Sequence, residues 1–222
     1  GNSTNCGGER TTLERALATS CNTAFGQLGL DVGADAMRDM AERFGFNADS
    51  QLDIRAATSR YPKDADKAQT ALSAIGQFDV ASSPLQMAQV VAAIANDGRM
   101  MRPYLVENVT TRDLQVISST KPSEQAKPVS EATAKQLQSM MQTVVREGTG
   151  RSARVDGLTI GGKTGTAQTA PDRPPYAWFV GYAEEPKVAV AVFIQDAGVA
   201  RDDISGGRLA APVFRAVVRA LR

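Results

Sequence analysis

Apolar residues recur every three or four positions in several segments of the chain, a spacing that places them on one face of a helix. Start and stop signals bound these segments. Ser83 followed by Pro84 is typical of a helix beginning, and Gly98 follows the end of the same segment. The pattern predicts helices over residues 11–20, 22–30, 35–44, 83–96, 130–147 and 212–222.

Polar residues at the helix beginnings predict how the first turns are capped. Thr11, with Glu14 three positions later, has the spacing of a capping box. Asn22 is the expected cap of the second helix, which places residues 20–22 in a tight connection between two helices. Ser130 is the expected cap of the helix that ends before the glycine at position 148.

The apolar residues of three helices are expected to face the core. They are Met37, Met40, Ala41 and Phe44 in the third helix, Leu85, Met87, Ala88, Val91, Ala92 and Ala95 in the fourth, and Phe214, Val217, Val218 and Leu221 in the last.

Three strand-like segments follow one another in the second half of the chain and predict an antiparallel meander. The third segment is apolar on both faces, so we expect an interior strand covered by helices on both sides. The meander occupies residues 160–168, 177–183 and 187–195.

The segments between the helices give three further predictions. Residues 104–109 and 114–117 predict a hairpin, and residues 121–127 predict a linker. Residues 47–67 predict a long irregular segment on the surface.

Composition narrows the classes of function. The 25 Lys and Arg residues nearly balance the 24 Asp and Glu residues, so no nucleic-acid partner is expected. The chain contains no histidine, which excludes Ser-His-Asp and Cys-His catalysis and any histidine-containing metal site within it. No cofactor or metal is expected.

The chain begins with Gly1 rather than Met and has no signal peptide, so we expect it to be a piece of a longer protein.

Cys6 and Cys21 are the two cysteines of the chain. They cannot complete a structural zinc site. In an exported protein they would be able to form a disulfide, whereas two small buried thiols explain the same residues in a reducing compartment.

The segment from Ile160 to Gln168 combines strand-like residues with three glycines around Lys163. Missing side chains let another backbone approach such a strand edge closely, as a bound peptide would. Lys163, Thr164 and Thr166 offer an ammonium group and two hydroxyls to a carboxylate. Lys-Thr-Gly occurs in penicillin-recognising enzymes, although for these three residues alone a glycine-containing strand with a solvated lysine is the better explanation.

Five signatures in order resemble class B penicillin-binding proteins, particularly those of actinobacteria and mycobacteria. They are the triplet Ser20, Cys21 and Asn22, the helix at residues 83–98, the segment 161–168, the Ala-Trp-Phe-Val-Gly-Tyr segment at 177–182 and the Ala-Ala-Pro-Val-Phe segment at 210–214. The resemblance spans nearly the whole chain. It implies an α/β protein of the α+β type, with the penicillin-binding protein/β-lactamase-like fold, in which helices flank an antiparallel sheet on both faces.

The resemblance also implies a peptidoglycan D,D-transpeptidase that acts through an acyl-serine and is a target of β-lactam antibiotics. Its partners would be peptidoglycan stem peptides, β-lactams and proteins of cell-wall synthesis, cell division and cell shape. The parent protein would be anchored in the membrane by an N-terminal segment and would act outside the cytoplasm.

By resemblance, Ser20, Asn22 and Lys163 are the catalytic residues. Ser20 would relay a proton, Asn22 would hold a substrate amide, and Lys163 would attract the terminal carboxylate and help to keep a second lysine neutral. Thr164, Gly165 and Thr166 would bind substrate: the two hydroxyls would bond the carboxylate, Gly165 would keep the strand edge open, and Thr166 would contribute an oxyanion-hole N–H. Helix caps at residues 20 and 22 explain those two residues without catalysis.

The nucleophile of this family belongs to a Ser-x-x-Lys motif that precedes the Ser-x-Asn triplet. We therefore expect it upstream of Gly1, which makes residues 1–222 the C-terminal part of one transpeptidase domain, inactive alone and open at one sheet edge. Ser118 to Lys121 also satisfies Ser-x-x-Lys, but it follows a predicted hairpin and has no helix pattern. The chemistry needs the two residues one helical turn apart, so we reject this segment.

Two alternatives remain open at the level of sequence. A serine β-lactamase on the same scaffold would differ by fast hydrolysis of the acyl-enzyme, and the chain offers no evident deacylating base. The second alternative is a non-catalytic protein, either a β-lactam sensor or a scaffold of cell-wall assembly. Such a protein would not need the catalytic residues, so the presence of Ser20, Asn22 and Lys163 argues against it.

Overall fold

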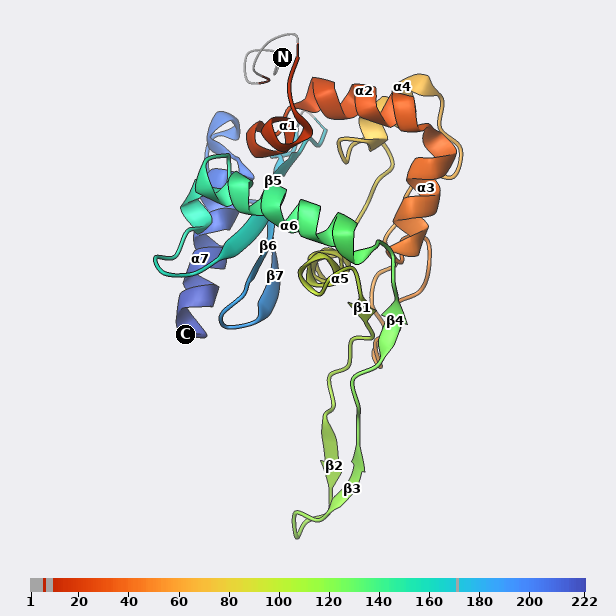
Figure 1. The fold of residues 1–222 in the computed structure, drawn as a ribbon, viewed down its shortest axis with the longest axis vertical. Helices are drawn as coiled ribbons and strands as arrows, with labels where there is room; N and C mark the ends of the chain where they lie inside the picture. The colour runs from red at the N-terminus through yellow and green to blue at the C-terminus, as the bar shows by residue number, and fades with distance from the viewer. Residues whose placement is uncertain (1–5, 7–9, 171) are drawn as a thin grey trace.

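A computed structural model describes residue 6, residues 10–170 and residues 172–222 (Figure 1). The polar, glycine-rich composition of residues 1–10 predicts a loop, and most of these residues lie outside the described ones. The α-helices are α1 (Leu13–Thr19), α2 (Asn22–Val32), α3 (Ala34–Arg43), α4 (Lys67–Ser73), α5 (Pro84–Ala95), α6 (Glu131–Arg146) and α7 (Ala211–Ala220). The strands are β1 (Met100–Met101), β2 (Asn108–Thr110), β3 (Val116–Ser119), β4 (Glu124–Ala126), β5 (Ile160–Ala167), β6 (Tyr176–Ala183) and β7 (Val188–Ile194).

The main sheet is the meander that the sequence predicts. Strands β5, β6 and β7 pair in that order, and both pairs are antiparallel. In this register Lys163 lies opposite Val180, and Thr164 lies opposite Phe179. Because successive side chains of a strand alternate between its faces, Lys163 and Thr164 leave β5 on opposite faces, yet both border one cleft at the end of the described sheet.

Each face of this sheet has its own core. On one face Phe179 and Val192 pack with Phe214 and Val218 of α7, and the rings of Phe179 and Phe214 lie 4.9 Å apart. On the other face Tyr182 belongs to a cluster with residues of α5 and α6. Helices therefore flank an antiparallel sheet on both faces, which confirms the predicted fold class.

Strand β7 is covered by helices on both faces, as predicted, and forms the open sheet edge expected for residues 1–222. Within the described residues its strand neighbour is β6, so β7 lies at one end of the sheet. All but one of its side chains are only half-buried. Its apolar residues contact helices on both faces of the sheet, α5 and α7, which explains a hydrophobic sequence without a second neighbouring strand.

A long hairpin leaves the body of the molecule between α5 and α6 (Figure 1). Its outer part pairs β2 with β3, as predicted, and every residue of these two strands is exposed. At its base β1 pairs with β4. The linker expected at residues 121–127 therefore contains a strand, because residues 124–126 close the base of the hairpin.

The capping box predicted at the first helix is wrong. Thr12, not Thr11, is the cap, and its hydroxyl accepts a hydrogen bond from the N–H of Arg15. Glu14 instead accepts a hydrogen bond of 2.6 Å from the hydroxyl of Thr143 in α6. A contact with a residue remote in sequence has replaced the local one.

The second helix begins as predicted, although its cap differs. Cys21 occupies the cap position without a side-chain hydrogen bond, and Asn22 is the first helical residue. Its apolar residues Leu28 and Leu30 are exposed, whereas Gly29 between them is buried. A Cβ at Gly29 would lie 2.4 Å from the Cβ of Ala74, so the small residue lets the two segments approach.

The core faces of three helices are predicted only in part. No residue of α3 is buried, so its methionines are not core residues within the described chain. In α5 the buried residues are Gln86, Val91, Ala93 and Ile94, of which only Val91 was expected. In α7 Phe214 and Val218 are buried, as expected, but Val217 and Leu221 are exposed.

The segment between α3 and α5 is irregular over residues 47–66, as predicted, and then forms the short helix α4, for which we made no prediction. Asp66 caps it in a capping box with Gln69. None of the described helices is long and apolar enough to cross a membrane.

Candidate active site

A cleft of about 1230 Å³ lies where several parts of the chain meet. It is lined by the α1–α2 connection with Ser20 and Asn22, the end of α4 and the residues after it, the turn after α6, strand β5 with Lys163, and residues 205–208 before α7. A volume of this size exceeds what a typical small ligand needs, so the cleft has room for an extended peptide. Among the described residues no cluster of acidic, cysteine or histidine side chains could hold a metal ion.

Ser20 ends α1 in a left-handed backbone conformation, with φ 57° and ψ 50°. Its N–H still bonds the carbonyl groups of the last helical turn, at Ala16 and Leu17. The N–H of Cys21 also bonds the Ala16 oxygen, at 2.9 Å. This conformation is costly for a residue other than glycine, asparagine or aspartate. The helix end and the following residue therefore have to hold Ser20 in place.

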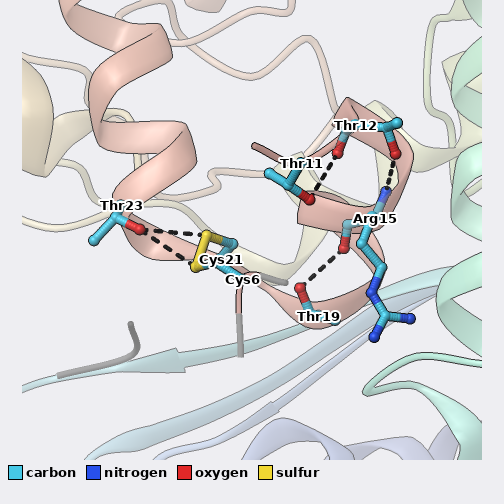
Figure 2. Close-up of a disulfide and its surroundings, with 7 residues drawn as sticks. All are labelled: Cys6, Thr11, Thr12, Arg15, Thr19, Cys21 and Thr23. Carbon is cyan, nitrogen blue, oxygen red and sulfur yellow. Dashed lines mark hydrogen bonds between the residues drawn. A yellow bond between two sulfur atoms is a disulfide. The ribbon is translucent and has the colours of Figure 1, made fainter. Parts of the chain in front are cut away.

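A disulfide between Cys6 and Cys21 fixes the residue after Ser20 (Figure 2). Of the two states considered for these cysteines, the structure has the paired one. The hydroxyl of Thr23 in α2 lies 3.3 Å from one sulfur and 3.4 Å from the other. The disulfide thus ties the α1–α2 connection to a segment 15 residues earlier in the chain.

Lys163 connects the Lys-Thr-Gly motif of β5 to the Ser-x-Asn motif that begins at Ser20. Its Nζ donates a hydrogen bond of 2.8 Å to the Oγ of Ser20 and another of 2.8 Å to the carbonyl oxygen of Thr164. Residues 143 positions apart in sequence are therefore in contact. Burial lowers the pKa of Lys163 from 10.5 to about 8, because removal from water disfavours the charged form.

The direction of this hydrogen bond matters for the chemistry of Ser20. A hydroxyl can accept and donate at once. The ammonium of Lys163 has only protons to give, so Ser20 accepts from it and keeps its own O–H for another group. The arrangement fits a hydroxyl that passes a proton to or from a third partner in the cleft.

The other predicted site residues also line the cleft. Asn22 is exposed at the first position of α2, and its side chain makes no hydrogen bond to the described residues. Thr166 is exposed on β5, where its hydroxyl accepts a hydrogen bond of 3.4 Å from the N–H of Gly206. Gly165 lies between Thr164 and Thr166 at the same strand edge.

Sequence reasoning missed two parts of the cleft. Thr149, in the turn after α6, has its Oγ1 2.6 Å from the Oγ1 of Thr164. Gly206 approaches β5 and β6 so closely that a Cβ there would lie 2.1 Å from the carbonyl oxygen of Trp178. The available signals were the glycines themselves, at positions 148 and 150 and at 206 and 207.

The second Ser-x-x-Lys string lies elsewhere in the molecule. Ser118 and Ser119 belong to the exposed strand β3, and the hydroxyl of Ser119 bonds the side chain of Asn108 in the same hairpin. The hydroxyl of Thr120 bonds the carbonyl of Val106. These residues lie on no helix and line no part of the cleft.

Residues 2–219 match the model of the penicillin binding protein transpeptidase domain. The chain belongs to this family. This transpeptidase domain is 43% identical to the peptidoglycan D,D-transpeptidase PbpA of Mycolicibacterium smegmatis, over 97% of this chain and 45% of the relative. It is 41% identical to PbpA of Mycobacterium tuberculosis, with the same shares covered. The resemblance to actinobacterial members of the family is confirmed.

The fold of the transpeptidase domain is also that of a solved relative. Penicillin-binding protein A from M. tuberculosis, in its ceftriaxone acyl-enzyme complex, matches with a TM-score of 0.90 at 38% identity. The match covers 97% of this chain and 50% of that one. The chain therefore spans about half the length of the relatives it matches.

Proposed function

We propose that the protein containing this chain is a peptidoglycan D,D-transpeptidase that cross-links stem peptides through an acyl-serine. The hydrogen bond between Lys163 and Ser20 carries the proposal, because it assembles two distant motifs at one cleft. The names of the mycobacterial relatives support it. Residues 1–222 would form the C-terminal part of a single transpeptidase domain, and the nucleophile would come from a Ser-x-x-Lys motif upstream.

In the proposed reaction the nucleophilic serine forms an ester with the donor peptide and displaces its terminal residue as an amine. That amine must gain a proton as the peptide bond breaks. Ser20 supplies it from its O–H and regains one from the serine that has attacked, so no net charge is left on Ser20. Lys163 keeps the Ser20 oxygen in position for both transfers.

The remaining site residues would bind the donor peptide along the edge of β5. Asn22 faces its amide, and Lys163 attracts its terminal carboxylate together with the hydroxyls of Thr164 and Thr166. The backbone N–H of Thr166 would supply one donor of the oxyanion hole, a kind of group whose removal typically slows catalysis by about 10² to 10³.

β-Lactam antibiotics would enter the same cleft. The M. tuberculosis relative has been solved as a ceftriaxone acyl-enzyme, which is the species expected when a β-lactam traps the nucleophilic serine. We further propose that the protein acts outside the cytoplasm, anchored in the membrane by an upstream segment, alongside other proteins of cell-wall synthesis and division. The disulfide beside Ser20 agrees with an oxidising compartment.

Incubation of the full-length protein with benzylpenicillin, followed by intact-mass and peptide mass spectrometry, tests the proposal. We expect one covalent adduct, on a Ser-x-x-Lys serine outside residues 1–222. Lys163→Ala should slow acylation at least tenfold while the thermal midpoint stays close to the parental value, since Lys163 lines a cleft and its burial as a cation is unfavourable.

Other results would contradict parts of the proposal. An adduct on Ser118 would overturn the assignment of the motifs, and the absence of any adduct would favour a non-catalytic protein. A Lys163→Ala variant that reacts at the parental rate but melts earlier would make Lys163 a structural residue. Rapid release of the penicilloyl group by hydrolysis would identify a β-lactamase.

A further inference from the structure

Thr149 contacts three other segments that border the cleft. Its N–H donates a hydrogen bond of 3.0 Å to the carbonyl oxygen of Ala18, two residues before Ser20. Its hydroxyl oxygen lies 2.6 Å from that of Thr164 in β5. Its carbonyl oxygen lies where a Cβ on Gly207 would be only 2.5 Å away. One residue thus contacts the Ser20 connection, the strand of Lys163 and the turn before α7.

The backbone, and not the hydroxyl, fixes the place of Thr149. Gly148 approaches α1 so closely that a Cβ there would lie 2.2 Å from the oxygen of Ala18. The N–H of Gly150 bonds the carbonyl of Val144 and so holds the other side of the turn to α6. Removal of the Thr149 hydroxyl alone should therefore leave the turn in place.

The hydroxyl pair has two possible directions, and an anion selects one of them. Each hydroxyl has a single proton to donate. When Thr164 donates to Thr149, Thr164 has no proton left for a ligand. When Thr149 donates to Thr164, the proton of Thr164 is free. A carboxylate only accepts hydrogen bonds, so Thr164 can bind it only in the second arrangement.

Thr149 is the one described residue whose side chain bonds the hydroxyl of Thr164. Thr164 is buried, while Thr149 and Thr166 are exposed, so the position of the Thr164 proton depends on its threonine neighbour more than on water. A proton already aimed at the ligand costs no reorientation when the carboxylate arrives.

We infer that Thr149 is a positioning residue for recognition of the ligand carboxylate: by donating to Thr164, it aims the Thr164 proton at that carboxylate. The inference rests on the proposed function, because it assumes that the cleft binds a carboxylate beside Lys163. Thr149 itself need not touch the ligand.

Two penicillin ligands separate this role from a structural one. Benzylpenicillin carries the carboxylate, and its methyl ester is neutral at the same position. For the full-length protein, we expect Thr149→Val to lower the second-order acylation rate with benzylpenicillin about three- to tenfold, the range for loss of one hydrogen bond. The dissociation constant of the non-covalent complex should rise by this factor, and the limiting acylation rate should stay unchanged. Acylation by the methyl ester should slow less, because its neutral carbonyl oxygen accepts a weaker hydrogen bond than a carboxylate does.

Variants test whether Thr149 acts through Thr164. Thr149→Ser keeps the hydroxyl and should lose less than Thr149→Val. In a Thr164→Val background, Thr149→Val should have no further effect, because the group it orients is gone. Thr159→Val is the matched control: Thr159 is an exposed threonine next to β5, and its hydroxyl makes no hydrogen bond among the described residues.

The outcomes separate the two proposals. If the parental protein is not acylated by benzylpenicillin, the proposed function fails. If it is acylated, a Thr149→Val variant that matches the parent with benzylpenicillin overturns the inference. Equal slowing with benzylpenicillin and with its ester, or additive losses in the double variant, would also overturn it, because either result would mean a general change in the cleft.

Discussion

Burial sets the protonation state of the residue that joins the two motifs. Lys163 has a pKa lowered from 10.5 to about 8, so most molecules carry its charge at neutral pH. A lysine in water keeps its charge to a much higher pH. The charge that would attract a carboxylate is therefore lost only about one pH unit above neutrality.

Raising the pH should weaken recognition of the carboxylate. Deprotonation of Lys163 above about pH 8 removes its positive charge, while the carboxylate of benzylpenicillin stays ionised. We expect the acylation rate with benzylpenicillin, divided by that with its neutral methyl ester, to fall as the pH rises through 8. Titration of other groups that changes both acylation rates by the same factor does not change this ratio.

Lys163→Arg is the matched variant for this titration. A guanidinium keeps its charge throughout this pH range, so the ratio of the two acylation rates should stay flat. A parental ratio that does not change between pH 7 and pH 9.5 would mean that the charge of Lys163 has no part in ligand binding.

Single residues of the site were predictable to the extent that a local motif contains them. Ser20, Asn22 and Lys163 lie in such motifs, and the structure brings all three to one cleft. Thr149 lies in no motif that the sequence analysis used. Its contact with Thr164 depends on how α6 ends against α1 and β5, which no pattern of neighbouring residues encodes.

Among the elements, α1 and α6 set the geometry of the cleft through their ends. The turn after α6 meets the end of α1 through the hydrogen bond from Thr149 to Ala18. Earlier along the two helices, Thr143 of α6 bonds Glu14 of α1. Since α1 ends at Ser20, any separation of these helices should move Ser20 away from Lys163.

Gly148→Ala should separate the two helices. The new Cβ would lie 2.2 Å from the backbone oxygen of Ala18, and neither atom can move away by a side-chain rotation. We expect a loss of about 1–3 kcal/mol in the free energy of unfolding, the usual range for an overpacked site. Acylation by a fluorescent penicillin should slow as well. Thermal unfolding and acylation of the same preparation measure both effects.

Gly26→Ala in α2 is the control for this change. A Cβ at Gly26 would meet its nearest atom at 3.7 Å, which is ordinary contact, and alanine favours a helix over glycine. The control should be as stable as the parent or more stable. A Gly148→Ala variant with parental stability and rate would show that α1 and α6 can separate without cost.

The elements themselves were largely predictable, because the helix and strand periods of residues 11–44, 83–98, 130–147 and 160–195 are long and regular. Their contacts were predicted less well. Gln86 is buried because its amide bonds the carbonyl of Phe44, 42 residues away, where an apolar pattern predicts an outward side chain. The capping box of Thr11 with Glu14 does not form, because Glu14 accepts a hydrogen bond from Thr143. Thr12 caps α1 instead. In each case a long-range hydrogen bond overrides a local preference.

At the scale of the whole molecule, the hairpin of β2 and β3 extends away from the body that contains α1, α6 and β5 (Figure 1). It carries several exposed apolar side chains, and Leu114 at its tip is 81% exposed. No residue of the hairpin lines the cleft. The two strands therefore contribute little to the core around β5, β6 and β7.

Shortening the hairpin should leave the chemistry intact. Replacement of residues 108–119 by Asn-Gly, a dipeptide suited to a tight turn, removes only exposed strands and the loop between them. We expect the full-length protein to keep its thermal midpoint and its rate of acylation by benzylpenicillin. Slower acylation would show that the hairpin supports the cleft from a distance.

The same hairpin offers a place to attach a reporter. Its tip, at residues 111–115, lies between two paired strands and tolerates an insertion better than any segment near Ser20. A short peptide epitope or a genetically encoded fluorophore is preferable there to a dye on an added cysteine. An added thiol would compete for the pairing of Cys6 with Cys21, whereas an inserted tag would allow imaging of the protein in cells with this disulfide and the cleft undisturbed.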